Sequence, residues 1–151
     1  MKVRRKFHSI EESCYLTEQS LLTDLSFVVR EKTSPIRCYR IAQEFDYASG
    51  RTDLLGLGQQ DEVHAFETKL SKWRDALHQA RRNLCFAHYC YVVLPVKASS
   101  IALQFEREFV KHGIGLIVLG MQQANLAIKP HRNDPLLPWL TKAALAHFGN
   151  E

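Results

Sequence analysis

The chain has 151 residues, of which 46% are hydrophobic and 24% are charged, a globular composition that excludes disordered and fibrous proteins. This length suits a single core, so we expect one domain over residues 1–151. No apolar run approaches the roughly 20 residues of a membrane span, and the N-terminus lacks a secretory signal pattern. We therefore expect a cytoplasmic protein with no membrane partner. The net charge of +4 permits an anionic partner such as nucleic acid without requiring one.

The first half of the chain reads as one helix followed by three strands. Leucines and valines at helical spacing predict an amphipathic helix that begins near Ile10 or Thr17 and ends near Arg30. Strands are predicted at residues 36–45, 51–57 and 63–70. The polar turn between the last two strands predicts a hairpin.

The second half alternates helices and strands. Helices are predicted at 72–84, 98–113 and 135–148, and strands at 88–95, 114–119 and 124–130. Ser71 is the expected N-cap of the first of these helices. Gly113 is the expected C-cap of the second, with Ile101, Phe105 and Phe109 facing inward. Consecutive strands favour antiparallel pairing and strand–helix–strand units favour parallel pairing, so the order predicts an α/β three-layer domain with a central mixed β-sheet flanked by helices.

The hairpin stretch "RTDLLGLGQQDEVHAFETKLSKW" carries three charges inside segments that are otherwise built for burial: Asp53, Glu67 and Lys69. A charge in such a strand is costly unless it meets a partner or a metal. Glu67 and Lys69 are two residues apart, which places both on one face of a strand. Asp53 lies on the neighbouring strand, where it can approach Glu67.

Two carboxylates on adjacent strands form a hard-oxygen site that suits Mg²⁺ or Mn²⁺. A lysine beside such an ion can orient a water or stabilise charge on a phosphate. The three side chains together are a minimal set for metal-assisted hydrolysis of phosphodiester bonds.

These residues resemble the PD-(D/E)XK nuclease superfamily, with Thr52-Asp53 in place of the PD element and Glu67-Thr68-Lys69 as (D/E)XK. The predicted order of elements also matches the core of that restriction-endonuclease-like fold, over roughly residues 17–119. The resemblance implies a Mg²⁺-dependent nuclease, with DNA as the expected substrate. Asp53, Glu67 and Lys69 would be its catalytic residues, and Asp53 and Glu67 its metal ligands.

The resemblance also implies auxiliary residues. An acidic residue on the first helix often completes the metal shell in this superfamily, and Glu18 is the first candidate, with Glu44 as its competitor. The other interpretation of Glu18 is a favourable charge in the first turn of a helix. Gln79 is similar to the glutamine of the QxxxY element in the RecB-like branch, although position 83 is an asparagine.

The helix after the motif carries basic residues on its non-core side: Lys72, Arg74, Arg81 and Arg82. Such a face beside a metal site would bind phosphates, whereas the simpler interpretation is a solvated helix surface.

Alternatives to an active nuclease remain open at this point. Lys69 could form a structural ion pair with Asp53 or Glu67, a common arrangement that contributes little stability. The chain could also be a catalytically silent nucleic-acid-binding module on the same fold. In addition, apolar residues near the C-terminus, Leu136, Leu137 and Trp139, could form the patch of a homodimer.

Overall fold

A single mixed sheet organises the protein, whose structure is a computed structural model that describes residues 15–120 and 123–150. The strands are β1 (Arg40–Tyr47), β2 (Gly50–Leu57), β3 (Val63–Thr68), β4 (Tyr89–Pro95), β5 (Gly115–Gly120) and β6 (Gln123–Ile128). They lie side by side in chain order. Pairing is antiparallel for β1–β2, β2–β3 and β5–β6, and parallel for β3–β4 and β4–β5. The predicted mixed sheet is confirmed.

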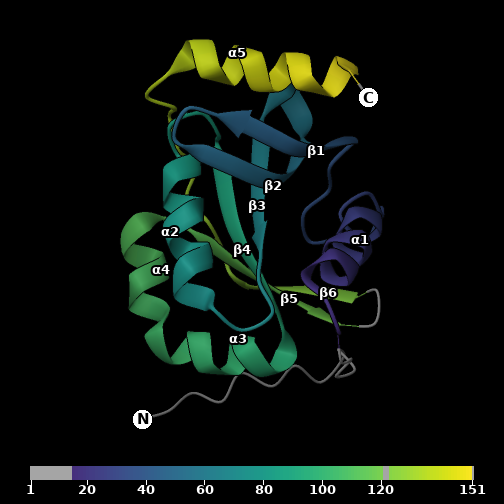
Figure 1. The fold of residues 1–151 in the computed structure, drawn as a ribbon, viewed down its shortest axis with the longest axis vertical. Coiled ribbons are helices and arrows are strands. Elements are labelled where there is room, and N and C mark those ends of the chain that lie inside the picture. The colour runs from purple at the N-terminus through teal and green to yellow at the C-terminus, as the bar shows by residue number, and fades with distance from the viewer. Residues whose placement is uncertain (1–14, 121–122, 151) are drawn as a thin grey trace.

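Helices cover both faces of this sheet (Figure 1). They are α1 (Glu18–Val28), α2 (Trp73–Asn83), α3 (Val96–Ala102), α4 (Glu106–His112) and α5 (Pro138–His147), with short 3₁₀ turns η1 (Gln59–Asp61), η2 (Leu103–Phe105) and η3 (Phe148–Asn150). Helix α1 packs on one face, and α2 to α5 pack on the other. The predicted α/β three-layer fold is therefore confirmed.

Alternation along the strands divides the core into two clusters. In β2, Leu54 faces the α1 side and Leu55 faces the α2 side, and both are fully buried. Strand β4 is buried through most of its length because helices cover both of its faces. None of the described helices is long and apolar enough to cross a bilayer.

Several predicted boundaries shift for local reasons. Helix α1 takes the later of its two predicted starts, since Thr17 caps it reciprocally with Ser20; Ile10 lies outside the described residues. The prediction of Ser71 as N-cap was wrong: Lys72 occupies that position, without a side-chain capping bond. The first strand begins at Arg40, later than predicted, although Cys38 before it is buried.

The predicted helix 98–113 is broken into α3, η2 and α4. The break is at Phe105, whose φ of −115° and ψ of 31° are not helical. The prediction of inward side chains is confirmed for Phe109, which is buried, and was wrong for Ile101, which is 50% exposed, and for Phe105, which is 40% exposed. Gly113 ends α4 in the left-handed conformation, as predicted.

Candidate active site

The C-terminal end of β3 and the neighbouring part of β2 carry the two carboxylates of the predicted site. The β2–β3 ladder pairs Leu54 with Phe66, so Asp53 and Glu67 are the next residue on each strand. The Asp53 carboxylate accepts hydrogen bonds from Thr68, at 2.9 Å from its backbone N–H and 3.1 Å from its hydroxyl. These contacts hold Asp53 across the gap between the strands.

Glu67 is fully buried and points toward helix α2. Asn83, at the end of α2, donates from Nδ2 to Glu67 Oε1 at 2.8 Å. The Asn83 oxygen in turn accepts hydrogen bonds from Tyr47 Oη at 2.5 Å and from Thr52 Oγ1 at 2.9 Å. With its oxygen turned toward these two hydroxyl groups, the Asn83 amide presents its nitrogen to Glu67.

The second oxygen of Glu67, Oε2, is buried and has no hydrogen-bond partner among the residues that the structure describes. Burial raises the pKa of Glu67 to about 9, with a further rise from the negative charge of Asp53 beside it. A buried carboxyl group in this state either holds a proton or needs a cation. An unpartnered carboxylate oxygen next to a second carboxylate fits a hard divalent cation.

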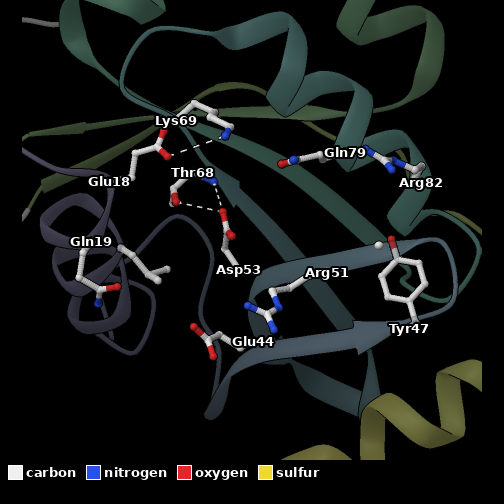
Figure 2. Close-up of a pocket in the computed structure, with 12 residues that line it drawn as sticks. Glu18, Gln19, Glu44, Tyr47, Arg51, Asp53, Thr68, Lys69, Gln79 and Arg82 are labelled. Carbon is white, nitrogen blue, oxygen red and sulfur yellow. Dashed lines mark hydrogen bonds and ion pairs between the residues drawn. The ribbon is translucent and has the colours of Figure 1, made fainter.

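A polar pocket of about 350 Å³ opens beside Asp53 (Figure 2). Its walls come from α1, the β1–β2 hairpin, the end of β3 and α2. Lys69 lies at its rim, where its Nζ is 3.7 Å from Glu18 Oε1. Glu18 is thus placed on the pocket and pairs with the candidate catalytic lysine.

The first hairpin contributes the wall opposite α1. Glu44 lines the pocket from an exposed position in β1, with a φ of 52°. Neighbouring pairs of the β1–β2 ladder, Gln43 with Leu54 and Phe45 with Thr52, continue on both sides of it. Glu44 therefore marks an irregular position in the strand, directly across from Asp53.

The basic residues of α2 separate into two groups. Arg82 lines the pocket and donates to the backbone carbonyl of Ser49 at 3.1 Å. Gln79 lines it too, and its side chain extends toward Asp53 and Lys69 (Figure 2).

The other basic residues predicted to bind phosphates, from the N-cap and the body of α2, do not line this pocket: Lys72, Arg74 and Arg81. The Arg74 guanidinium binds the Glu108 carboxylate at 2.7 and 2.9 Å and lies 4.2 Å from the Trp73 ring centroid. Its charge is already engaged on the α4 side.

Among residues that the structure describes, no three His, Cys, Asp or Glu side chains form a cluster able to hold a metal ion. The candidate centre therefore rests on two carboxylates, Asp53 and Glu67. Mg²⁺ is compatible with so few protein ligands because it retains several waters.

The sequence-based prediction missed the roles of three residues at the candidate site: Asn83, Thr68 and Tyr47. Asn83 stood out only as a departure from QxxxY, although a polar residue at the end of an apolar helical stripe is a signal of a buried hydrogen bond. Thr68 sits inside the motif, and only the fold reveals its bond to Asp53. Tyr47 comes from a different hairpin.

Comparison with known proteins shows the fold and no more. No protein-family model and no curated protein matches the chain. A solved structure of a protein of unknown function from Silicibacter pomeroyi is similar, with 20% identity, a TM-score of 0.54 and coverage of 73% of this chain and 71% of that one. A repair endonuclease from Pyrococcus abyssi aligns with 18% identity and a TM-score of 0.45, over 72% of this chain and 49% of that one.

Proposed function

We propose that this protein is a metal-dependent hydrolase of phosphodiester bonds in nucleic acid, with DNA as the expected polymer. The observation that carries the proposal is the unpartnered Oε2 of buried Glu67 beside Asp53. Glu67 itself does not line the pocket, whereas Asp53 and Lys69 both do. The motif Glu67-Thr68-Lys69 and the order of elements, which resemble the PD-(D/E)XK superfamily, support it.

Asp53 and Glu67 would hold Mg²⁺ or Mn²⁺. Such an ion supplies Lewis-acid stabilisation of phosphoryl charge and a more acidic water. The chain's own contribution is orientation: Thr68 fixes Asp53, and Asn83 fixes one oxygen of Glu67 while leaving the other available.

Lys69 would act on the reacting groups. Its side chain is 25% exposed, and its ammonium has Glu18 as ion-pair partner. A phosphate that entered the pocket would compete with Glu18 for this charge, because an ammonium stabilises an anionic transition state more strongly in a partly desolvated site. Arg82 and Gln79 would hold the neighbouring phosphate and sugar oxygens.

A cleavage panel tests the proposal. Plasmid, linear, single-stranded and branched DNA are incubated with Mg²⁺ or Mn²⁺ and the wild-type protein, Lys69→Ala or Lys72→Ala. Lys72 is a matched control because it is exposed and does not line the pocket. We expect cleavage by the wild type and by Lys72→Ala, and at least a hundredfold loss for Lys69→Ala. Absence of cleavage by the wild type on every substrate would refute the enzyme.

The second candidate is a nucleic-acid-binding module with a silent site. The observation in its favour is the raised pKa of Glu67, which favours a neutral carboxyl group at neutral pH as long as no cation is bound beside it. Binding of DNA without cleavage, unchanged by divalent ions, would favour this candidate over the enzyme.

A further inference from the structure

A second pocket, of about 430 Å³, lies toward the other end of β3. Thr68 lines the first pocket and His64 lines the second, so roughly 13 Å of strand separates their backbones. Neither the carboxylates nor the basic residues of α2 reach this second pocket. Its chemistry is aromatic and cationic.

A ladder of stacked aromatic rings leads from the core into this pocket. The parallel register pairs Phe66 with Tyr91 and His64 with Tyr89, and the ring centroids of each pair are 4.9 Å apart with planes within 19°. Phe66 and Tyr91 are buried, whereas His64 and Tyr89 are partly exposed and line the pocket. A hydrogen bond of 2.9 Å between His64 Nδ1 and Tyr91 Oη fixes the imidazole plane.

A second aromatic surface and two cations border the same pocket. Tyr39 is 50% exposed, and the Arg37 guanidinium lies 5.0 Å from its ring centroid. Lys129 is exposed at the pocket. The acidic residue among the lining side chains is Glu62, whose carboxylate lies 3.7 Å from Arg132 Nε, so its charge is partly offset. The balance at the rim is positive.

We propose that this pocket binds unpaired bases of single-stranded nucleic acid. Flat aromatic side chains beside cations suit this ligand, because every base offers a π-face for stacking and its phosphate offers a negative charge. Bases inside a duplex have both faces covered by their neighbours, so a duplex cannot stack on Tyr39 or Tyr89. The inference goes beyond the proposed function, since binding here needs neither a metal ion nor catalysis.

The test is fluorescence anisotropy of a labelled oligothymidylate with the full chain in EDTA, where metal-dependent cleavage cannot occur. We expect Tyr39→Ala to weaken binding by between about fivefold and a hundredfold. Arg37→Ala and Lys129→Ala should each reduce the slope of affinity against salt by about one. The matched controls are Trp139→Ala and Lys142→Ala, an exposed aromatic and an exposed cation on α5, which should bind as the wild type does.

Two further probes separate stacking from charge. An abasic chain of equal length should bind the wild type as weakly as oligothymidylate binds Tyr39→Ala, and a duplex should bind more weakly than the single strand. The inference would be overturned if Tyr39→Ala and Tyr89→Leu both bound oligothymidylate with wild-type affinity. It would also be overturned if the wild type bound the abasic chain as tightly as oligothymidylate. Tyr39 is exposed, so its variant is expected to fold even where Tyr89→Leu does not. If the protein binds oligothymidylate through this pocket but cleaves no substrate, the proposed nuclease function is refuted and the inference about the second pocket stands.

Discussion

Asn83 donates a 2.8 Å hydrogen bond to Glu67 Oε1 while its own carbonyl oxygen accepts from Tyr47 and Thr52. Four side chains from α2, β1, β2 and β3 thus meet at one buried amide. Glu67 thus has one oxygen, Oε1, engaged by Asn83, whereas Oε2 has no hydrogen-bond partner among the described residues. This arrangement links the stability of the fold to the geometry of the candidate site.

Asn83→Ala should destabilise the protein. The substitution leaves the carboxyl of Glu67 and the hydroxyl of buried Thr52 without their partner, and each unsatisfied buried group costs about 1–3 kcal/mol. We expect the free energy of unfolding, measured by urea titration, to fall by about 2–4 kcal/mol. The control on the same helix is His78→Ala, which changes an exposed side chain and should alter stability by under about 0.5 kcal/mol. Equal stability of the two variants would contradict the network.

Glu67→Gln should change how stability depends on pH. Burial and Asp53 raise the folded-state pKa of Glu67 to about 9, above its ordinary value of 4.5, so the folded state binds the extra proton. Its contribution is fully present below pH 4.5 and is lost as pH rises toward 9, with a slope of at most about 1.4 kcal/mol per pH unit. In EDTA, the wild type should lose stability over this window, and Glu67→Gln should not. Parallel curves for the two proteins would contradict the assignment.

Asp53→Ala and Lys69→Ala should separate ion binding from chemistry. Without Asp53 the site has one carboxylate, so calorimetry should detect no Mn²⁺ binding and cleavage should disappear with it. Lys69→Ala should retain Mn²⁺ and DNA binding while cleavage falls. Asp75→Ala is a suitable control, since Asp75 is an exposed carboxylate on α2 that does not line the pocket. Normal cleavage by Asp53→Ala would refute the mechanism.

Gly115→Ala should destabilise the sheet and disturb the second pocket. A Cβ atom at Gly115 would lie 2.8 Å from Tyr91 Cδ1 and 3.0 Å from Pro130 Cδ, and such overpacking costs about 1–3 kcal/mol. We expect a lower midpoint of thermal unfolding together with weaker oligothymidylate binding. Gly149→Ala is its control, because a Cβ there meets nothing within 4 Å. Identical midpoints for the two variants would argue against this packing.

The sequence supports the order of elements because alternation and helical spacing are local signals. Strands β2 and β3 and the stripe of α2 at Trp73, Ala76 and Ala80 follow from such signals. The break at Phe105 does not, since Ile101, Phe105 and Phe109 keep a helical period in the sequence while the backbone departs from it. Both α3 and α4 contact β5, and the local periodicity of a sequence carries no information about such tertiary contacts.

The candidate site, like the fold, could be predicted from the sequence only in part. Asp53, Glu67 and Lys69 can be found because charges in buried strands are unusual. The sequence could not show that Arg82 lines the pocket while Arg74 pairs with Glu108, because both are exposed arginines on one helix. Their difference depends on which elements lie beside each turn of α2, and the order of elements does not contain that information.

The left-handed backbone of Glu44 has a consequence for tolerance to insertions and deletions. Ala42 and Phe45 both face the α2 side although they are three positions apart, so Glu44 resets the alternation of β1. Removal of one residue here would leave Ala42 and Phe45 two positions apart and still on one face of a regular strand, yet it would shift the pairing of Phe45 and Tyr47 with β2 by one residue. Tyr47 would then lose Asn83. A length change in β1 would thus damage the carboxylate site from a strand that contributes neither of its two carboxylates.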